Sequence, residues 1–432
     1  MSAVVSSHLM TTTAKPKSVL RTIDAVWRIE SPRLIAGLVR MLRDIGDAED
    51  AAQNALVAAL EDWPKSGVPD NPGAWLMATA RNRAIDRLRR EKLALQKFDG
   101  LGDESGFAAV SLQSPSEAAD DDIGDDLLRL MFVACHPILP AEARVALTLR
   151  LLGGLSTEEI ARAFLLPDAT IAQRIVRAKK TLAQQPVVFE VPRFTELSER
   201  LNSVLEVIYL IFNEGYAASS GNDWMRPGLC DEALRLGRVL TGLLPDQSEV
   251  HGLVALMEIQ ASRAPARVNG DGEPILLLEQ NRSQWDRLLI HRGLIALKRA
   301  EQLGGCKKPY ALQAAIAACH ARALRADDTD WAAIAAHYDT LASVMPSPVV
   351  ELNRAVAFGM GYGPAAGLQL ADQLVDEPAL TRYHLLPAVR GDLLFKLGRL
   401  DEAREQFQLA AMLTDNEREQ RLMKQRAAAC SS

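Results

Sequence analysis

LSTEEIARAFLLPDATIAQRIVRAKKTL, residues 155–182, has the pattern of two short helices joined by a tight turn. The first helix opens on a capping signal, in which the hydroxyl group of Ser156 or Thr157 is followed by the carboxylate of Glu159. Pro167 then breaks the helical periodicity, and a second helix starts near Thr170. Two short helices separated in this way predict a helix-turn-helix.

The second of these helices is cationic. From residue 170 to residue 182 it carries two arginines, two lysines and no acidic residue. A cationic helix that enters the major groove of DNA through its N-terminus places its early residues at base edges and its later cations on phosphates. The candidate DNA-binding residues of this helix are Thr170, Gln173, Arg174, Arg177, Lys179 and Lys180. The alternative is a solvated basic helix in an unrelated bundle.

The same segment resembles region four of the extracytoplasmic-function (ECF) RNA polymerase sigma factors. The family pattern is Leu-Ser-x-x-Glu-Ile-Ala, a short turn, Thr-Val-Lys-Ser-Arg, and then Arg-Ala-Arg/Lys-Lys-x-Leu. Here Ala169, Ala172 and Gln173 stand where the family commonly has Gly, Lys and Ser. The resemblance implies a module that binds the minus-thirty-five element of a promoter, with a base preference that these three differences leave open.

A second resemblance lies nearer the N-terminus. The stretch DAEDAAQ, residues 47–53, followed by an apolar run, resembles the region-two helix with which this family docks on the polymerase clamp. In that family charged rim contacts surround an apolar centre on a coiled coil of the largest polymerase subunits. The resemblance implies a set of candidate polymerase-binding residues: Asp47, Glu49, Asp50, Gln53, Asn54 and Val57. The alternative is that these acids merely complement the dipole at a helix start.

The stretch AWLMATARNRAIDRLRR, residues 74–90, resembles the promoter-melting helix of the family. Its cations suit phosphate contacts, and the amide of Asn82 both donates and accepts hydrogen bonds. By resemblance, the preceding loop from Trp63 to Asn71 captures a flipped base of the minus-ten element. Trp75 fits a core position better than a stacking platform. The candidate DNA-binding residues of this segment are Asn82, Arg83, Asp86, Arg87, Arg89 and Arg90.

Composition divides the chain into segments. Residues 1–18 are expected to be disordered, and helices are expected over residues 19–97, with Pro32 opening one of them. Residues 98–126 hold nine acidic residues and no Lys or Arg, which predicts an extended acidic linker. By resemblance this linker threads the active-site cleft of polymerase, and the alternative is a flexible tether. Helical periodicity returns over residues 127–185, and Pro186 and Pro192 mark the next boundary.

Residues 192–432 have the pattern of paired helices separated by Gly, Pro or Asp. In the clearest pair, residues 385–413, the small residues Gly391 and Ala403 and the large Phe407 are spaced as in tetratricopeptide repeats (TPRs). The arrangement resembles a subgroup of ECF sigma factors with long C-terminal TPR-like extensions that regulate the sigma module in place of a separate anti-sigma protein. The resemblance therefore implies an intramolecular contact between the extension and the sigma domains.

Several functions are excluded by what the sequence lacks. Five scattered cysteines, no signal-peptide core and no apolar run of about 18 residues indicate a cytoplasmic protein with no membrane partner. Cys135 and His136 are adjacent but have no second ligand pair nearby, so no metal and no other cofactor is expected. No nucleophile motif, Gly-rich phosphate loop or HExxH is present, so the chain is not expected to be an enzyme.

These patterns predict an all-α fold, with two small helical sigma domains, the second a helix-turn-helix, joined by an acidic linker and followed by a helical-repeat, TPR-like domain. The net charge of −6 means that DNA binding must depend on local cationic segments rather than on the whole chain. The predicted function is that of a sigma factor that binds core RNA polymerase, recognises promoter DNA and helps to melt it, under the control of its C-terminal domain. The alternative is a helix-turn-helix transcriptional regulator with a helical-repeat sensor domain that acts without core polymerase.

Overall fold

The structure is a computed structural model that describes residues 16–99, 119–164, 166–185, 189–192, 194–216, 226–269, 275–414 and 417–430. Every regular element in these ranges is a helix, which confirms the predicted all-α class. The chain divides into two compact units, a first of residues 1–161 and 167–204 and a second of residues 162–166 and 205–432. None of the described helices is both long and apolar enough to cross a lipid bilayer.

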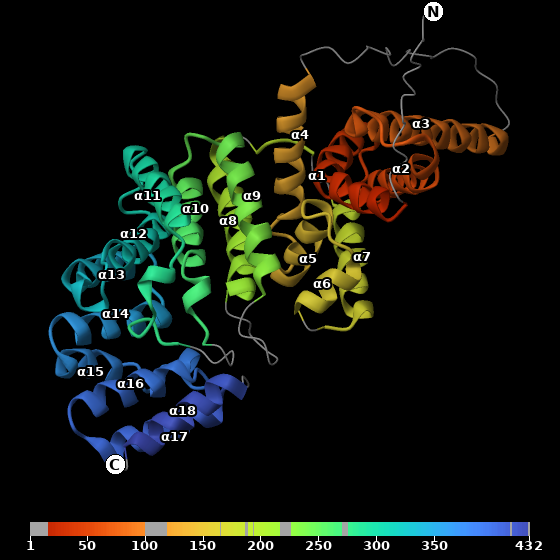
Figure 1. Ribbon diagram of the computed structural model, residues 1–432. Coiled ribbons are helices and arrows are strands. Elements are labelled where there is room, and N and C mark those ends of the chain that lie inside the picture. The colour runs from red at the N-terminus through yellow and green to blue at the C-terminus, as the bar shows by residue number, and fades with distance from the viewer. Residues whose placement is uncertain are drawn as a thin grey trace, which may run out of the picture. The chain divides into compact units, whose positions relative to one another are not determined.

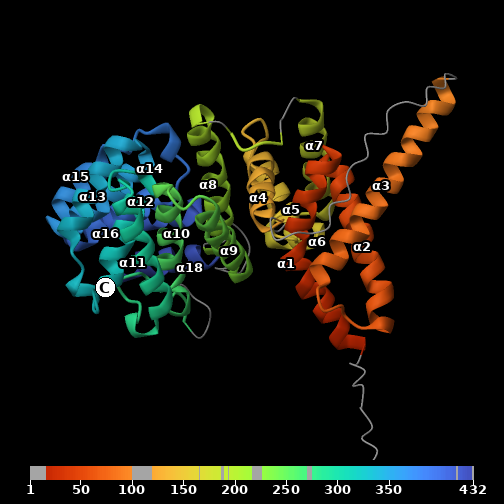
Figure 2. The same cartoon turned by 90° about the horizontal axis from the view of Figure 1, so that it is seen from above.

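The first unit begins with three helices that pack on one another, α1 (Pro16–Leu42), α2 (Ile45–Ser66) and α3 (Pro72–Asp99). Figure 2 shows α3 as a long helix that runs past α1 and α2. Pro32 lies inside α1, so the expectation that it opens a helix is wrong. A proline inside a helix removes one backbone hydrogen bond, and here Leu34, Ile35 and Leu38, all buried, hold the following turns against the core.

Both ends of α2 have clear physical causes. Asp44 caps α2 by accepting a hydrogen bond from the backbone of Asp47 at 2.8 Å. The helix continues through the first four residues of the predicted minus-ten loop, 63–66, and ends before Gly67, whose φ of 90° suits glycine. Trp63, in the last turns of α2, is 1% exposed and packs edge-to-face on Trp75 of α3, with ring centroids 5.3 Å apart.

Four further helices follow in the first unit, α4 (Ala119–Ala134), α5 (Ala141–Leu151), α6 (Thr157–Phe164) and α7 (Asp168–Gln184), with the end of α6 assigned to the second unit. Helix α4 begins inside the predicted acidic linker, and the preceding residues 100–118 lie outside the described ranges. Asp126, near the end of that linker, is buried and forms ion pairs with Arg40 and Arg129. Helices α6 and α7 form the predicted helix-turn-helix.

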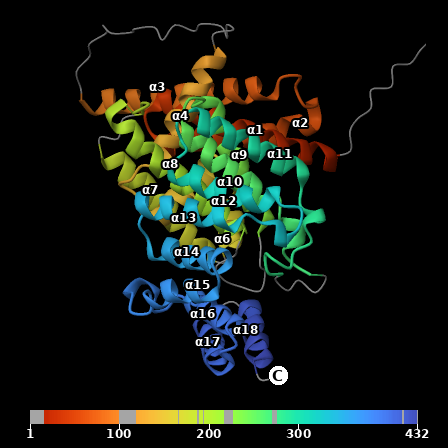
Figure 3. The ribbon, with the colours of Figure 1, turned by 90° about the vertical axis from the view of Figure 1, so that its left-hand side faces the viewer.

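Helix α8 (Phe194–Tyr216) begins in the first unit and ends in the second. The second unit continues as a succession of helices that Figures 1 and 3 show from two sides, with α16 to α18 at the C-terminal end. The helices of this succession are α9 (Pro227–Leu243), α10 (Ser248–Ala261), α11 (Arg287–Gln302), α12 (Pro309–Arg322), α13 (Trp331–Val344), α14 (Pro348–Gly361), α15 (Pro364–Asp372), α16 (Leu385–Lys396), α17 (Leu400–Leu413) and α18 (Glu417–Ala429).

The pair α16 and α17 shows how the repeat is packed. A Cβ atom on Gly391 of α16 would lie 2.8 Å from the ring of Phe407 of α17, which is 1% exposed. The absence of a side chain at Gly391 therefore gives Phe407 its space, and Ala403 and Ala410 are fully buried on the same helix as Phe407. This confirms the TPR-like repeat that the spacing of small and large residues predicted.

One departure from the repeat pattern, residues 268–286, has a packing role. Arg282 in this stretch is 4% exposed and donates to the carbonyl oxygens of His320 and Ala323 and to Oγ1 of Thr329, each at 2.9 Å. These bonds tie the stretch to the end of α12 and to the turn before α13. The unusual sequence therefore serves to join neighbouring helix pairs.

Candidate polymerase and DNA interfaces

The capping box predicted for the helix-turn-helix is present in both directions. The hydroxyl group of Ser156 accepts from the backbone of Glu159 at 3.1 Å, and the carboxylate of Glu159 accepts from the backbone of Ser156 at 2.8 Å. Two backbone donors at the start of α6 are thereby satisfied. This fixes the helix that precedes the turn.

Helix α7 is oriented by one apolar face. Ile171, Ile175, Ala178 and Leu182 are all buried at spacings of three and four residues. The other faces carry the candidate DNA-binding residues, of which Gln173, Arg177 and Lys180 are exposed and Thr170, Arg174 and Lys179 are partly exposed. The arrangement supplies a cationic surface on a helix whose rotation is fixed by its core.

Helix α2 presents an exposed stripe. Asp50, Asn54 and Val57 are exposed at positions i, i+4 and i+7, and Leu60 extends the stripe with 42% of its surface exposed. Exposed apolar side chains beside an acid and an amide match the rim and centre of a protein interface. Of the other candidates on this helix, Asp47 and Gln53 are partly exposed, whereas Glu49 is buried.

Glu49 is engaged inside the first unit. It is 4% exposed, and its carboxylate forms ion pairs with Arg150 of α5 at 2.6 Å and with Lys179 of α7. The Nε2 group of Gln53 donates to the same carboxylate at 2.8 Å. Burial acts to raise the pKa of Glu49, but Lys179 and Arg150 outweigh burial, so that the pKa lies below its usual value of 4.5.

The role of Arg150 could not be read from the sequence. It lies 101 positions from Glu49 and carries no local motif that marks it as a partner. Its Nη1 group also donates to the carbonyl oxygen of Leu155 at 3.1 Å, which ties it to the loop before α6. Arg150 therefore joins the loop before the helix-turn-helix to α2 through one carboxylate.

Two further contacts in the first unit join α1 to α6 and to the turn before it. Arg28 of α1 forms an ion pair with Glu159 of α6 at 2.8 Å, where Arg28 is exposed and Glu159 is partly exposed. Gly154, with a φ of 64°, lies so close to α1 that a Cβ atom there would stand 3.0 Å from the hydroxyl oxygen of Ser31. Ser31 is 1% exposed, so the turn before α6 is pressed against α1.

Helix α3 begins where Asn71 accepts from the backbone of Ala74 at 3.0 Å. Asn82, Arg83 and Asp86 are exposed on it, and Nη1 of Arg83 donates to the carbonyl oxygen of Asn54 in α2 at 2.7 Å. The candidates Arg87, Arg89 and Arg90 are in the helix, but their side chains lie outside the described set. The candidate melting residue Asn82 is thus held close to the exposed stripe of α2.

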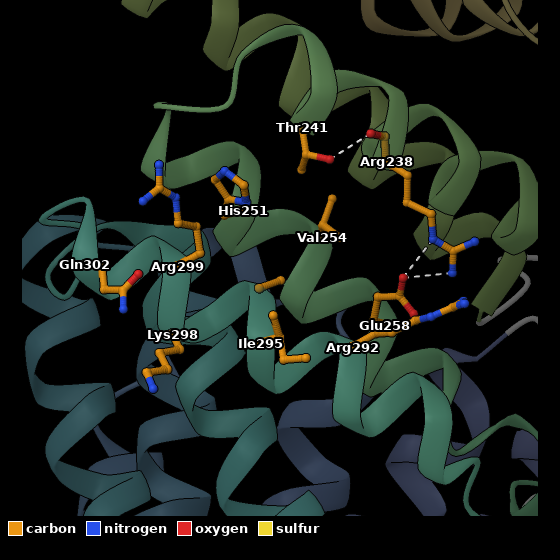
Figure 4. Close-up of a pocket in the computed structure, with 11 residues that line it drawn as sticks. Arg238, Thr241, His251, Val254, Glu258, Arg292, Ile295, Lys298, Arg299 and Gln302 are labelled. Atoms are coloured by element: carbon orange, nitrogen blue, oxygen red, sulfur yellow. Dashed lines mark hydrogen bonds and ion pairs between the residues drawn. The ribbon is translucent and has the colours of Figure 1, made fainter.

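A pocket of about 850 Å³ opens in the second unit between α9, α10 and α11 (Figure 4). Glu258 lines it and is 2% exposed, paired through Oε1 with Nη2 of Arg238 at 2.7 Å. Arg292 and Lys298 also line it, and neither has an acidic partner in the part of the chain that the structure describes. The rim is therefore cationic, around an apolar floor that includes Val254. No motif in the sequence marked this pocket.

Cys135 and His136 have the surroundings of structural residues. Cys135 is buried and shares a hydrogen bond with the hydroxyl group of Thr148 at 3.3 Å. Burial lowers the pKa of His136 to about 4, and Arg200 adds to the effect. Among the described residues no group of three or more His, Cys, Asp or Glu side chains is placed to hold a metal ion.

A helix-turn-helix with a cationic helix, on a chain that also carries a repeat domain, defines a DNA-binding transcription protein. Family models agree with this class: Sigma-70 region 2 matches residues 27–93, and Sigma-70 region 4 matches residues 129–182. A third model, a family of unknown function (DUF6596), matches residues 200–301. The first match contains the stretches 47–53 and 74–90, and the second contains the stretch 155–182, on which the two resemblances were based.

Similar proteins identify the family. The ECF RNA polymerase sigma factor SigK of Mycobacterium ulcerans is 31% identical over 155 residues, which cover 34% of this chain and 77% of that protein. The ECF RNA polymerase sigma-E factor of Escherichia coli is 29% identical over 161 residues, 36% of this chain and 82% of that protein. The chain belongs to the extracytoplasmic-function sigma factor family.

The extension has relatives of its own. An uncharacterized protein of Rhizobium meliloti is 42% identical over 400 residues, which cover 91% of this chain and 92% of that protein. The sigma regions and the extension therefore occur together in a second chain. Among solved structures, yeast Tom70 is 11% identical and covers 96% of this chain and 85% of that one, with a TM-score of 0.37, which is too low to bear on function.

Proposed function

We propose that this sigma factor is a cytoplasmic protein that binds core RNA polymerase through the stripe Asp50, Asn54, Val57 and Leu60 of α2. The exposed apolar pair at Val57 and Leu60, with an acid and an amide at its edge, carries the proposal, because apolar side chains surrounded by polar ones on one helix face are the composition of a protein interface. The acidic edge suits a basic surface on the partner. Asp47, Glu49 and Gln53 adjoin this stripe and belong to the proposed interface once Glu49 is released.

The same chain recognises promoter DNA through α7. The exposed Gln173 can read a base edge through its amide, while the exposed Arg177 and Lys180 lie on the same side of the helix and suit phosphates. Thr170 and Arg174, nearer the N-terminus of α7, are the proposed contacts with the floor of the major groove. This module binds the minus-thirty-five element.

Melting of the minus-ten element is assigned to α3 and the loop before it. Asn82 is exposed, and its amide can pair with the edge of an unstacked base. Trp63 and Trp75 are proposed to support the loop as packing residues and not to stack on a DNA base, because Trp63 is buried and Trp75 packs against it. The loop proper, residues 67–71, is the part of the predicted reader that remains outside a helix.

The second unit is proposed to regulate the sigma regions by contact within the chain. Covalent linkage gives the extension an effective concentration of the order of millimolar for the sigma regions, so that weak docking has a large effect. The expectation of a fixed and required contact, rather than simple release, rests on Pro186 and Pro192 in the sequence, because proline restricts the backbone. The alternative is that the extension masks the polymerase-binding or DNA-binding face. In that case removal of the extension should raise promoter activity instead of lowering it.

Promoter-specific transcription in a purified system tests this function. Core polymerase alone should give no specific transcript, and addition of the full chain should give one that starts at a defined position. Chains that end at Gln185 and at Leu303, each checked for folding, measure the contribution of the extension. If the full chain binds duplex DNA but never directs core polymerase, the alternative of a conventional helix-turn-helix regulator is correct.

A further inference from the structure

The pocket between α9, α10 and α11 has an apolar floor. Helix α10 supplies Val254, and α11 supplies Ala296 and Ile295, of which Ile295 is 57% exposed. Figure 4 shows Val254 and Ile295 near the middle of the pocket, with cationic side chains on either side of them. An apolar side chain that is exposed beside a cavity offers a surface that an apolar ligand can cover.

Close packing of α11 on α10 holds this floor in place. A Cβ atom on Gly293 of α11 would lie 2.5 Å from Cγ1 of Ile259 and 3.1 Å from the carbonyl oxygen of Ala255, both in α10. The absence of a side chain at Gly293 therefore lets the two helices approach each other. The pocket is part of this packed helix pair, and its volume of about 850 Å³ is in the range of small-molecule sites.

The charges around the pocket do not balance one another. Glu258 is the one acid among the described residues that line it, and Arg238 pairs with it. Arg299 pairs at 3.2 Å with Asp246, whose side chain is 82% exposed, and such an exposed pair contributes little, so that Arg299 can change partner. Four of the residues that line the pocket are cationic: Arg238, Arg292, Lys298 and Arg299. A ligand with a negative charge is therefore attracted to the pocket.

Glu258 orients one of these cations and leaves one acceptor unused. It is 2% exposed, and its Oε1 atom accepts from Nε and Nη2 of Arg238 at 2.8 and 2.7 Å. Its Oε2 atom is also buried and has no hydrogen-bond partner among the described residues. A buried acceptor without a donor is unfavourable. The site therefore favours a ligand that carries an N–H or O–H group near its anionic group.

The order of side chains along α11 indicates what such a ligand looks like. Arg292 and Arg299 are seven residues apart, or about 10.5 Å of helix, and Ile295 and Ala296 lie between them. The phosphates of a nucleic-acid backbone would pair with the two arginines but would leave Val254 and Ile295 uncovered. A purely apolar ligand would leave the cations without a partner. A ligand that satisfies both has an anionic group and an apolar body.

We propose that this pocket is a binding site for a small organic anion, a carboxylate or sulfonate with an aromatic or aliphatic body. The anionic group pairs with Arg292, whose planar guanidinium can hold it through two parallel hydrogen bonds. The apolar body covers Val254 and Ile295. The site belongs to the second unit alone, so it does not depend on the function proposed for the sigma regions.

The fluorescent probe 8-anilinonaphthalene-1-sulfonate tests the site on the full-length chain, because it combines a sulfonate, an N–H group and an apolar ring system. Its fluorescence should show one saturable component. Arg292→Gln should weaken this component about tenfold, as expected for loss of a charge-assisted bond, and Ile295→Ser should weaken it about threefold. Arg325→Gln and Leu288→Ser are matched controls outside the pocket, since Arg325 is exposed and Leu288, on α11, is 57% exposed like Ile295. Both controls should bind the probe as the unmutated chain does.

Competition on the unmutated chain separates the two parts of the ligand without any substitution. The anion 2-naphthoate should displace the probe at concentrations at least about tenfold lower than 2-naphthylmethylammonium, which has the same rings and the opposite charge, or sulfate, which has no apolar body. Equal displacement by the ammonium compound or by sulfate would overturn the proposal, as would stronger displacement by duplex DNA than by 2-naphthoate. Unchanged probe binding by an Arg292→Gln chain with a normal melting temperature would also overturn it. If Arg292→Gln lowers the melting temperature, the competition series and Lys298→Gln, which should weaken the probe at least about threefold, decide the outcome.

Discussion

Lys180 provides the most quantitative test of the DNA-binding face. Its side chain is exposed on α7 and is proposed to contact one phosphate. Each phosphate neutralised by a protein contributes about −0.9 to the slope of log K against log salt concentration. Lys180→Met should therefore make the slope shallower by about 0.9. Between 50 and 200 mM salt the unmutated chain should lose roughly 3.5-fold more affinity than the variant.

The assay is fluorescence anisotropy of the full-length chain on a labelled duplex at four or more salt concentrations. The loss of affinity should be similar on every sequence, because phosphate contacts carry no base information. Lys307→Met, which removes an exposed lysine from the loop between α11 and α12, is the matched control and should leave the slope unchanged. An unchanged slope with Lys180→Met, or an effect confined to one sequence, would refute the phosphate contact.

Three further predictions concern single side chains. Arg174→Ala should cost about 1 to 3 kcal/mol on the preferred duplex and relax the choice of one base pair, measured by competition with substituted duplexes; a loss uniform over all sequences would assign Arg174 to the backbone. Asn82→Ala should reduce transcription from duplex promoters, with polymerase binding intact and partial recovery on a pre-melted bubble; collapse of polymerase binding would show a structural role instead. Because Lys179 and Arg150 lower the pKa of Glu49, that carboxylate stabilises the fold of the first unit fully above about pH 4.5 and less as the pH falls below it. The melting temperature of the chain should fall over the same range, and in Glu49→Gln it should lack this component of the fall.

The local elements were predictable because short-range chemistry determines them. The capping box of Ser156 and Glu159 and the spacing of Gly391 and Phe407 each describe a contact within one or two helices, and the structure contains both. Helix boundaries were less predictable. Pro32 and Pro64 read as breaks, yet both lie inside helices, because the loss of one backbone bond is small against the apolar burial of the same helix.

The burial of Glu49 was not predictable from its own surroundings. In the sequence it is one of three acids near a helix start, and nothing nearby distinguishes it from Asp50. Its partner Arg150 is brought to it by the packing of α1 and α2 on the helix-turn-helix, a contact between residues 101 positions apart. The pocket between α9, α10 and α11 could not be predicted from the sequence for the same reason, because its cationic residues come from separate helices.

Binding to purified core RNA polymerase tests the central claim most directly. The full-length chain should bind core polymerase, and a variant with Asp50→Arg and Val57→Asp should bind about thirtyfold or more weakly, as expected when the centre and rim of an interface are both altered. Glu142→Arg, which reverses an exposed acid in the first turn of α5, is the control and should bind as the unmutated chain does. No binding by the unmutated chain, or equal binding by a correctly folded Asp50→Arg, Val57→Asp variant, would contradict the account.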